Sequence, residues 1–261
     1  MYFESCKNEN SPIICNVPHS GTLIPEEFIL DFSLSKDEIE EEVKYMADNY
    51  TDNLYSELIS VSSFVKSKIS RVVLDIERFK NEEDEPMSKV GMSALYRLTS
   101  SGKVLRNVSE INKKKLEEIY DDYHNTLTKL VSLSLDKNNS AIIVDCHSFP
   151  SKPRGYESDK EENRPDICIG VDEFHTPKDL VNLLKVNFEE FGFSVKINSP
   201  FSGSVVPLNF YKKDKKVVSV MIEVNRKLYM NEETFQKLKT FSSIGNKISR
   251  CVIKSINQFL N

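Results

Sequence analysis

Two histidines stand where the chain could hold a metal ion. His19 follows the apolar run 13–17, and His147 comes three residues after the apolar run 141–144. A neutral imidazole offers a ring nitrogen to Zn²⁺ or another divalent metal. The chain has only four histidines, so two at the ends of similar runs predict a metal centre. Asp145 either orients the His147 ring through its second nitrogen or caps a helix.

Glu223 is the next unusual residue, because it lies within the otherwise apolar run 217–224. A buried carboxylate costs free energy unless it has a partner or a chemical task. One interpretation is an ion pair with Arg226 or Arg78. The other is a general base that takes a proton from water, with a pKa raised by its surroundings.

Short apolar runs alternate along the chain with longer helical patterns. The runs predict buried strands over residues 13–17, 72–76, 141–144, 167–169, 194–197 and 217–224. Apolar residues at helical spacing predict helices over residues 36–60, 111–135, 177–191 and 232–260. This alternation predicts an α/β fold, a single domain over residues 1–261, with a mixed, mostly parallel β-sheet flanked by helices. Functional groups gather beyond the carboxyl ends of such strands.

Composition excludes several other classes of protein. The chain has 261 residues and a formal net charge of −5, which argues against a nucleic-acid partner. No run approaches the roughly 20 apolar residues of a membrane span, and the first residues show no signal-peptide pattern. Five widely spaced cysteines predict free thiols and a reducing, cytoplasmic location. The oligomeric state is left open.

Six segments, in this order and with similar gaps, resemble the N-formylglutamate amidohydrolase family. They are residues 17–25, 47–55, 70–78, 145–148, 198–203 and 222–230. The most distinctive are Val-Pro-His-Ser-Gly-Thr in the first, Asp-Cys-His-Ser in the fourth and Glu-Val-Asn-Arg in the last. The family is similar to the zinc-dependent exopeptidase and aspartoacylase fold. The resemblance implies one catalytic zinc at the carboxyl edge of the sheet and hydrolysis of an N-acyl amide on a small acidic amino acid.

Carried over by position, the resemblance implies that His19 and His147 are metal ligands. It also implies that Glu223 is the general base and that Arg78 is a catalytic residue that grips the substrate. Arg154 and Arg226 are further candidates for binding substrate carboxylates, because a guanidinium matches a carboxylate with two parallel hydrogen bonds. Asn198 and Ser202 are candidates for contacts with the substrate. For Arg154, which lies in a polar stretch, plain solvent exposure is the alternative.

The third metal ligand stays open at this stage. The related fold supplies an acid three residues after the first histidine, where this chain has Thr22. Asp48 is the preferred replacement, expected near the middle of a helix. Asp52, one helical turn later, and Glu77 are the rivals.

Two departures from the family pattern bear on the substrate. Glu77 stands where an asparagine is usual in an Asp-x-Asn-Arg pattern, and Gly203-Ser204 replaces a Gly-Gly pair. They leave open a zinc carboxypeptidase-like enzyme acting on another N-acyl amino acid or peptide. A non-catalytic ligand-binding relative is the third hypothesis.

Overall fold

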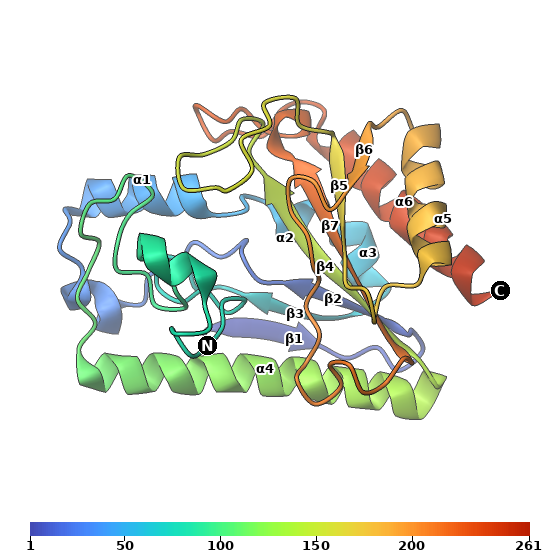
Figure 1. Cartoon of the computed structure of the whole chain (residues 1–261), viewed down its shortest axis with the longest axis horizontal. Coiled ribbons are helices and arrows are strands. Elements are labelled where there is room, and N and C mark those ends of the chain that lie inside the picture. The colour runs from blue at the N-terminus through green and yellow to red at the C-terminus, as the bar shows by residue number, and fades with distance from the viewer.

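The structure is a computed structural model that describes residues 1–261, and its seven strands form one sheet (Figure 1). The strands are β1 (Phe3–Cys6), β2 (Ile13–Val17), β3 (Ser63–Ser67), β4 (Ala141–Phe149), β5 (Ile167–Val171), β6 (Val195–Ile197) and β7 (Val217–Asn225). Their order across the sheet is β1-β3-β2-β4-β7-β5-β6. Only β1 with β3 and β5 with β7 pair antiparallel, so the predicted mixed, mostly parallel sheet is confirmed.

Helices cover both faces of this sheet. They are α1 (Lys36–Met46), α2 (Thr51–Leu54), α3 (Ser56–Ser60), α4 (Glu110–Asn138), α5 (Lys178–Glu190) and α6 (Phe241–Leu260). The long α4 runs along one face, whereas α5 and α6 pack together on the other (Figure 1). Short 3₁₀ turns are η1 (Glu26–Asp31), η2 (Pro86–Val90) and η3 (Arg226–Leu228). No helix is both long enough and apolar enough to cross a bilayer.

The alternation of side chains along β4 places the polar residues. Ile142, Val144 and Cys146 belong to the hydrophobic core that includes residues of α5 and α6, whereas Ile143 belongs to the core shared with α4. Because successive strand residues point to opposite faces, Asp145 and His147 lie on the α4 side. At its carboxyl edge, the face of the sheet toward α4 therefore carries Asp145 and His147.

The strand predicted over residues 72–76 is wrong. This stretch forms tight turns, in which Val73 N and Leu74 N both donate to Ser70 O. Val72, Val73 and Leu74 are nevertheless at most 2% exposed. An apolar run reports burial, and burial alone does not distinguish a strand from a packed turn. The strand that pairs with β2 is instead β3. Polar residues alternate with apolar ones in this half-buried strand, so it contains no apolar run and the apolar pattern does not predict it. The same holds for β1.

Two predicted helices are shorter or broken in the structure. Residues 36–60 form α1, α2 and α3, with a non-helical stretch at residues 47–50. Tyr50 adopts a left-handed backbone with φ +67°, which interrupts the helical path. The last helix begins at Phe241 rather than at residue 232. In contrast, α4 and α5 lie within a few residues of the predicted bounds.

Candidate metal centre

The parallel register of the central strands brings the candidate residues together. His147 on β4 is in register with Glu223 on β7, and Asp145 is in register with Asn16 on β2. His19 lies two residues beyond the end of β2. The centroids of the two imidazole rings are 5.0 Å apart, and each histidine is only 4% exposed. The expectation that both histidines lie at one edge of the sheet is confirmed.

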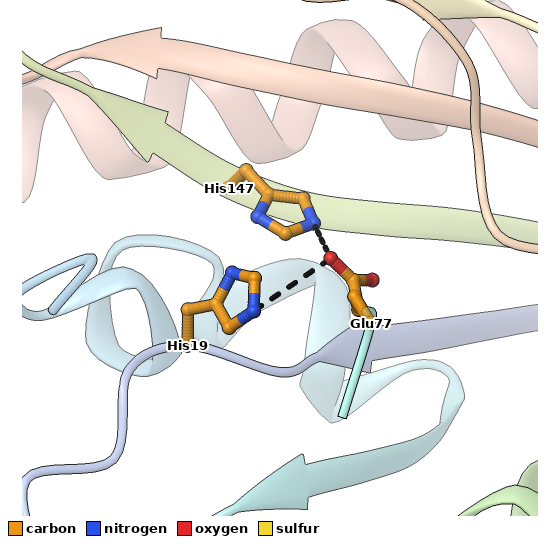
Figure 2. A group of neighbouring side chains, drawn as sticks. All are labelled: His19, Glu77 and His147. Carbon is orange, nitrogen blue, oxygen red and sulfur yellow. Dashed lines mark ion pairs between the residues drawn. The ribbon is translucent and has the colours of Figure 1, made fainter. Parts of the chain in front are cut away.

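Carboxylates face the Nε2 atoms of both rings. Asp75 Oδ1 lies 2.8 Å from His19 Nε2, and Asp145 Oδ1 lies 3.1 Å from His147 Nε2. Glu77 Oε2 lies between the rings, 3.0 Å from His147 Nε2 and 3.9 Å from His19 Nε2 (Figure 2). Donor atoms of His19, Glu77 and His147 lie within 4.8 Å of one another. This spacing fits a divalent cation.

Asp48 faces the other nitrogen of each ring. Its Oδ2 lies 3.1 Å from His147 Nδ1 and 3.9 Å from His19 Nδ1, and Figure 2 shows both Nδ1 atoms turned away from Glu77. The Asp48 Oδ1 accepts a hydrogen bond from Arg226 Nη2 at 2.9 Å. Asp48 lies in the non-helical stretch after α1, so its expected place within a helix is wrong. That stretch directs it into the centre, since Asp48 N donates to His19 O.

Asp52 does not join the centre. It lies on α2, and its carboxylate pairs with Lys66 Nζ at 3.3 Å. The break between α1 and α2 separates Asp48 from Asp52, which an unbroken helix would have placed on one face.

The pKa values at the centre are strongly shifted by burial and by neighbouring charges. Burial and the nearby Arg71 charge lower the pKa of His19 to about 4. Burial also opposes charge on His147, but the carboxylates of Glu77 and Asp145 outweigh it and raise its pKa well above the usual value. Burial and the charge of Asp145 raise the pKa of Glu77 to about 7.

The pKa of Asp48 is shifted in the opposite direction to that of Glu77. Burial favours its neutral acid, yet the hydrogen bond to His147 and the charge of Arg226 hold the pKa of Asp48 below its usual range. Asp48 is therefore an anion in a buried setting, as a metal ligand requires.

Glu223 is buried and forms no ion pair. It is 7% exposed, its Oε2 has no hydrogen-bond partner, and it forms no ion pair with Arg226 or Arg78. Burial raises the pKa of Glu223 to about 8. The ion-pair interpretation of this residue is therefore wrong. An unpartnered buried carboxyl group beside the His147 imidazole is a feature of functional sites rather than of stable packing.

The three candidate arginines differ in their partners. Arg226 is tied to Asp48 and also donates to Ser148 Oγ at 3.3 Å. Arg78 has carboxylates no closer than 3.6 Å, and its buried Nε has no hydrogen-bond partner. Arg154 is 8% exposed and forms no ion pair with any carboxylate, so the solvent-exposed alternative is wrong. Its guanidinium lies 3.8 Å from the centroid of the Tyr45 ring.

The remaining candidate residues lie on the segment after β6. The Asn198 Oδ1 accepts a hydrogen bond from Val171 N at 2.9 Å, so this side chain is engaged in holding the end of β5. Ser202 is exposed. The same segment crosses the polar face of the sheet, where Val205 N donates to Asp145 Oδ2 at 3.3 Å.

Asp75, Arg71 and Asn16 surround the centre, and the sequence alone did not assign them roles. Asp75 is fully buried and accepts hydrogen bonds from Arg71 Nη2 at 2.7 Å and from Tyr96 OH at 2.8 Å. The signal for Asp75 and Arg71 was present, since both lie in the segment 70–78 that resembles the family. Asn16 carried only the weaker signal of an amide within an apolar strand.

A comparison with known proteins bears on this centre. The family model described as N-formylglutamate amidohydrolase matches residues 11–230. The chain belongs to the N-formylglutamate amidohydrolase family. The matched range contains every residue of the centre, and the predicted family and amidohydrolase class are confirmed.

One relative by sequence and two solved structures are similar to this chain. N-formylglutamate deformylase of Pseudomonas putida is 24% identical over 233 residues, which are 85% of this chain and 82% of the relative. The crystal structure of N-formylglutamate amidohydrolase from Ralstonia eutropha JMP134 matches with a TM-score of 0.83 at 20% identity, over 98% of both chains. A gene product from Agrobacterium tumefaciens matches with a TM-score of 0.69 at 17% identity, over 100% of this chain and 96% of that one. The two structural likenesses show a shared fold.

Proposed function

We propose that this chain hydrolyses the amide bond of an N-acyl acidic amino acid, such as N-formylglutamate, with the help of a divalent cation such as zinc. The observation that carries the proposal is the joint burial of two imidazoles, an Asp48 carboxylate bonded to Arg226, and an unpartnered Glu223 at one edge of the sheet. Family membership supports the reaction class, and the donor atoms support the cation.

His19, His147 and Asp48 form the ligand set that we favour. Metal-binding histidines commonly direct their second nitrogen to a carboxylate, which fixes the ring. Here Asp75 occupies the Nε2 of His19 and Asp145 occupies the Nε2 of His147. Both Nδ1 atoms therefore remain for a cation beside Asp48. Binding through the Nε2 atoms with Glu77 would instead displace both orienting carboxylates.

When bound, the cation supplies Lewis acidity, which polarises a carbonyl group and acidifies water. Glu223 then acts as the general base. It takes a proton from the attacking water, whose oxygen bonds to the acyl carbon, and gives a proton to the amine nitrogen as the carbon–nitrogen bond breaks. A carboxyl group with a pKa near 8 is a strong base for this task, and the cation's charge would lower that pKa toward neutrality.

Arg154 and Arg78 bind the substrate carboxylates in this proposal. Arg154 is buried and pairs with no carboxylate, and Arg78, whose side chain is 28% exposed, has carboxylates no closer than 3.6 Å. An incoming carboxylate would therefore complete their hydrogen bonding. Arg226 already bonds Asp48 and serves to hold that ligand rather than the substrate.

The decisive experiment compares Glu223→Gln with the natural protein. We expect the variant to keep its zinc content, measured by elemental analysis, and to lose kcat by about 10²–10⁴-fold, the contribution typical of a general base. Asp31→Asn is the matched control, because this buried carboxylate bonds Ser109 and Asn112 and touches neither imidazole. Protein that neither contains nor takes up a divalent metal would refute the metal-dependent mechanism.

Glu77 gives a reason to test more than one substrate. Its carboxylate reaches the space between the rings, with 19% of the side chain exposed, and a fixed negative charge there would repel an acidic substrate. Rates on formyl, acetyl and succinyl derivatives of glutamate, aspartate and glutamine separate N-formylglutamate from other acyl amino acids. Tight binding without turnover in the presence of zinc would favour a binding protein instead.

A further inference from the structure

Asn16 is a buried amide that the mechanism above leaves without a task. It is 1% exposed and lies in β2 among isoleucine, cysteine and valine. Its Nδ2 donates two hydrogen bonds of 2.9 Å, one to Glu77 Oε1 and one to Asp145 Oδ1. Its Oδ1 accepts a hydrogen bond of 2.7 Å from Tyr123 OH. Burying such a group costs free energy unless it is paired, and here both of its ends are paired.

The two carboxylates that Asn16 joins are those that meet at one atom of His147. Glu77 Oε2 lies 3.0 Å and Asp145 Oδ1 3.1 Å from His147 Nε2. Two carboxylates so close to each other repel. The two amide hydrogens of Asn16 lie between them and offset that repulsion.

Tyr123 determines which way the amide faces. Its hydroxyl donates to Asn16 Oδ1 from α4, and its only other polar neighbour is Val65 O at 3.4 Å, which is also an acceptor. The phenol therefore acts as a donor, and the amide oxygen must face α4. The amide nitrogen is left to face the carboxylates.

We infer that Asn16 is a positioning residue that holds Glu77 and Asp145 together on the Nε2 side of His147, and so keeps the Nδ1 of His147 directed at Asp48. This inference rests on the proposed function, in that His147 is taken to bind the cation through Nδ1.

Asn16→Asp is the first test. The new side chain keeps the shape and the bond from Tyr123, but it replaces both donors with an acceptor. We expect zinc affinity, measured by competition with a chelator, to fall about 10–100-fold, as for other residues that orient a metal ligand. An added negative charge by itself would strengthen cation binding, so a loss of affinity reports displacement of the ring.

Asn187→Asp is the matched control for general destabilisation. Asn187 is 2% exposed, and its Nδ2 bonds Ser255 Oγ and Gln258 Oε1 between α5 and α6, on the opposite face of the sheet. This variant should bind zinc as the natural protein does. The double variant Asn16→Asp/Glu77→Gln restores an amide beside the carboxylates at unchanged net charge, and it should recover most of the lost affinity.

A second measurement separates this inference from the proposed function. The imidazole nitrogen and N–H resonances of His147, recorded by NMR in metal-free and zinc-loaded protein, should change in Asn16→Asp and return toward the natural pattern in the double variant. Unchanged resonances in folded Asn16→Asp, or zinc affinity equal to or above that of the natural protein, would overturn the role of Asn16.

Natural protein that binds no zinc would refute the proposed function, while the metal-free resonances would still test Asn16. If Asn16→Asp fails to fold, Tyr123→Phe decides by the same two measurements. This variant frees the Asn16 amide to turn over. It should therefore lower the zinc affinity and change the His147 resonances in the same direction as Asn16→Asp, by a smaller amount. No shift in either would then refute the inference.

Discussion

At the scale of single residues, the centre depends on which buried charges have partners. Asp48 and Arg226 are each 2% exposed and bond each other at 2.9 Å, and Asp48 also lies 3.1 Å from His147 Nδ1. Glu223 has no oppositely charged partner, and Arg154 bonds only uncharged groups such as Tyr156 OH. In the proposed function, the paired residues build the site, and Arg154 and Glu223 serve substrate binding and proton transfer.

Arg226→Met should therefore destabilise the fold. Removal of Arg226 takes away the closest guanidinium partner of the buried Asp48, which keeps His147 at 3.1 Å and Arg71 at 3.8 Å, so we expect a cost of up to about 3 kcal/mol in the free energy of unfolding. Urea unfolding in the presence of a chelator measures the loss. Lys254→Met, which breaks the exposed pair of Lys254 with Glu190, should change stability far less. Equal effects of the two variants would contradict the structural role of Arg226.

Arg154→Met should act on substrate binding. We expect KM for N-formylglutamate to rise about 10–100-fold with kcat changed only slightly, because the lost contact is made equally in the ground state and the transition state. The preference for the glutamate over the glutamine derivative should fall by a similar factor. Arg250→Met, on the exposed side of α6, is the control. Retained discrimination in Arg154→Met would exclude this residue from carboxylate binding.

At the scale of elements, the loop after β2 holds His19 in place by close backbone contacts. Leu23 N donates to Lys68 O, and Ser70 N donates to Leu23 O. A Cβ added to Gly21 would lie 2.5 Å from Lys68 C and 2.6 Å from Ile69 O. These neighbours are backbone atoms, so they cannot move aside as a flexible side chain would. The glycine of the His-Ser-Gly motif is there because the backbones of two segments meet.

Gly21→Ala should consequently lower both stability and metal affinity. Overpacking of this kind costs about 1–3 kcal/mol, and the shift of the loop moves His19 away from Asp48. Thermal unfolding and chelator competition measure the two effects. Gly155→Ala is the control, because an added Cβ there meets nothing within 4 Å, and it should leave both quantities unchanged. A Gly21→Ala protein with natural zinc affinity would show that the loop tolerates displacement.

At the scale of the whole molecule, the centre is assembled from segments that lie far apart in the chain. His19, Asp48, His147 and Glu223 meet only in the folded protein, so a cation that binds there as we propose would stabilise the folded state and not the unfolded one.

Zinc at about 100 times its dissociation constant should add about 2.7 kcal/mol to the free energy of unfolding. For a chain of this size the corresponding rise in Tm is about 5–10 °C. Differential scanning calorimetry with and without zinc measures it, and a chelator should reverse it. His147→Ala should remove this rise in Tm. A natural protein whose Tm does not change when zinc is added would argue against a preformed metal centre.

Sequence reasoning located His19, His147 and Glu223 because the apolar runs before them are real strands. Periodicity and run length report local burial, and β2, β4 and β7 are buried at every residue. The same reasoning placed a strand at residues 72–76, because a packed turn and a buried strand have the same apolar signature. It also extended one helix through Asp48, since the left-handed Tyr50 that separates α1 from α2 is not visible in the hydrophobic pattern.

The sequence by itself determined the α/β class and the family, and it indicated the two histidines and Glu223 as candidates, because these depend on local patterns and on motifs in order. Only the tertiary structure decided which acids surround the histidines. It brought Asp48 to their Nδ1 atoms, placed Asp75, Glu77 and Asp145 on the Nε2 side, and directed Asp52 toward Lys66. Those placements depend on strand register and on turns between distant segments. Neither can be detected from the periodicity of apolar residues in the sequence.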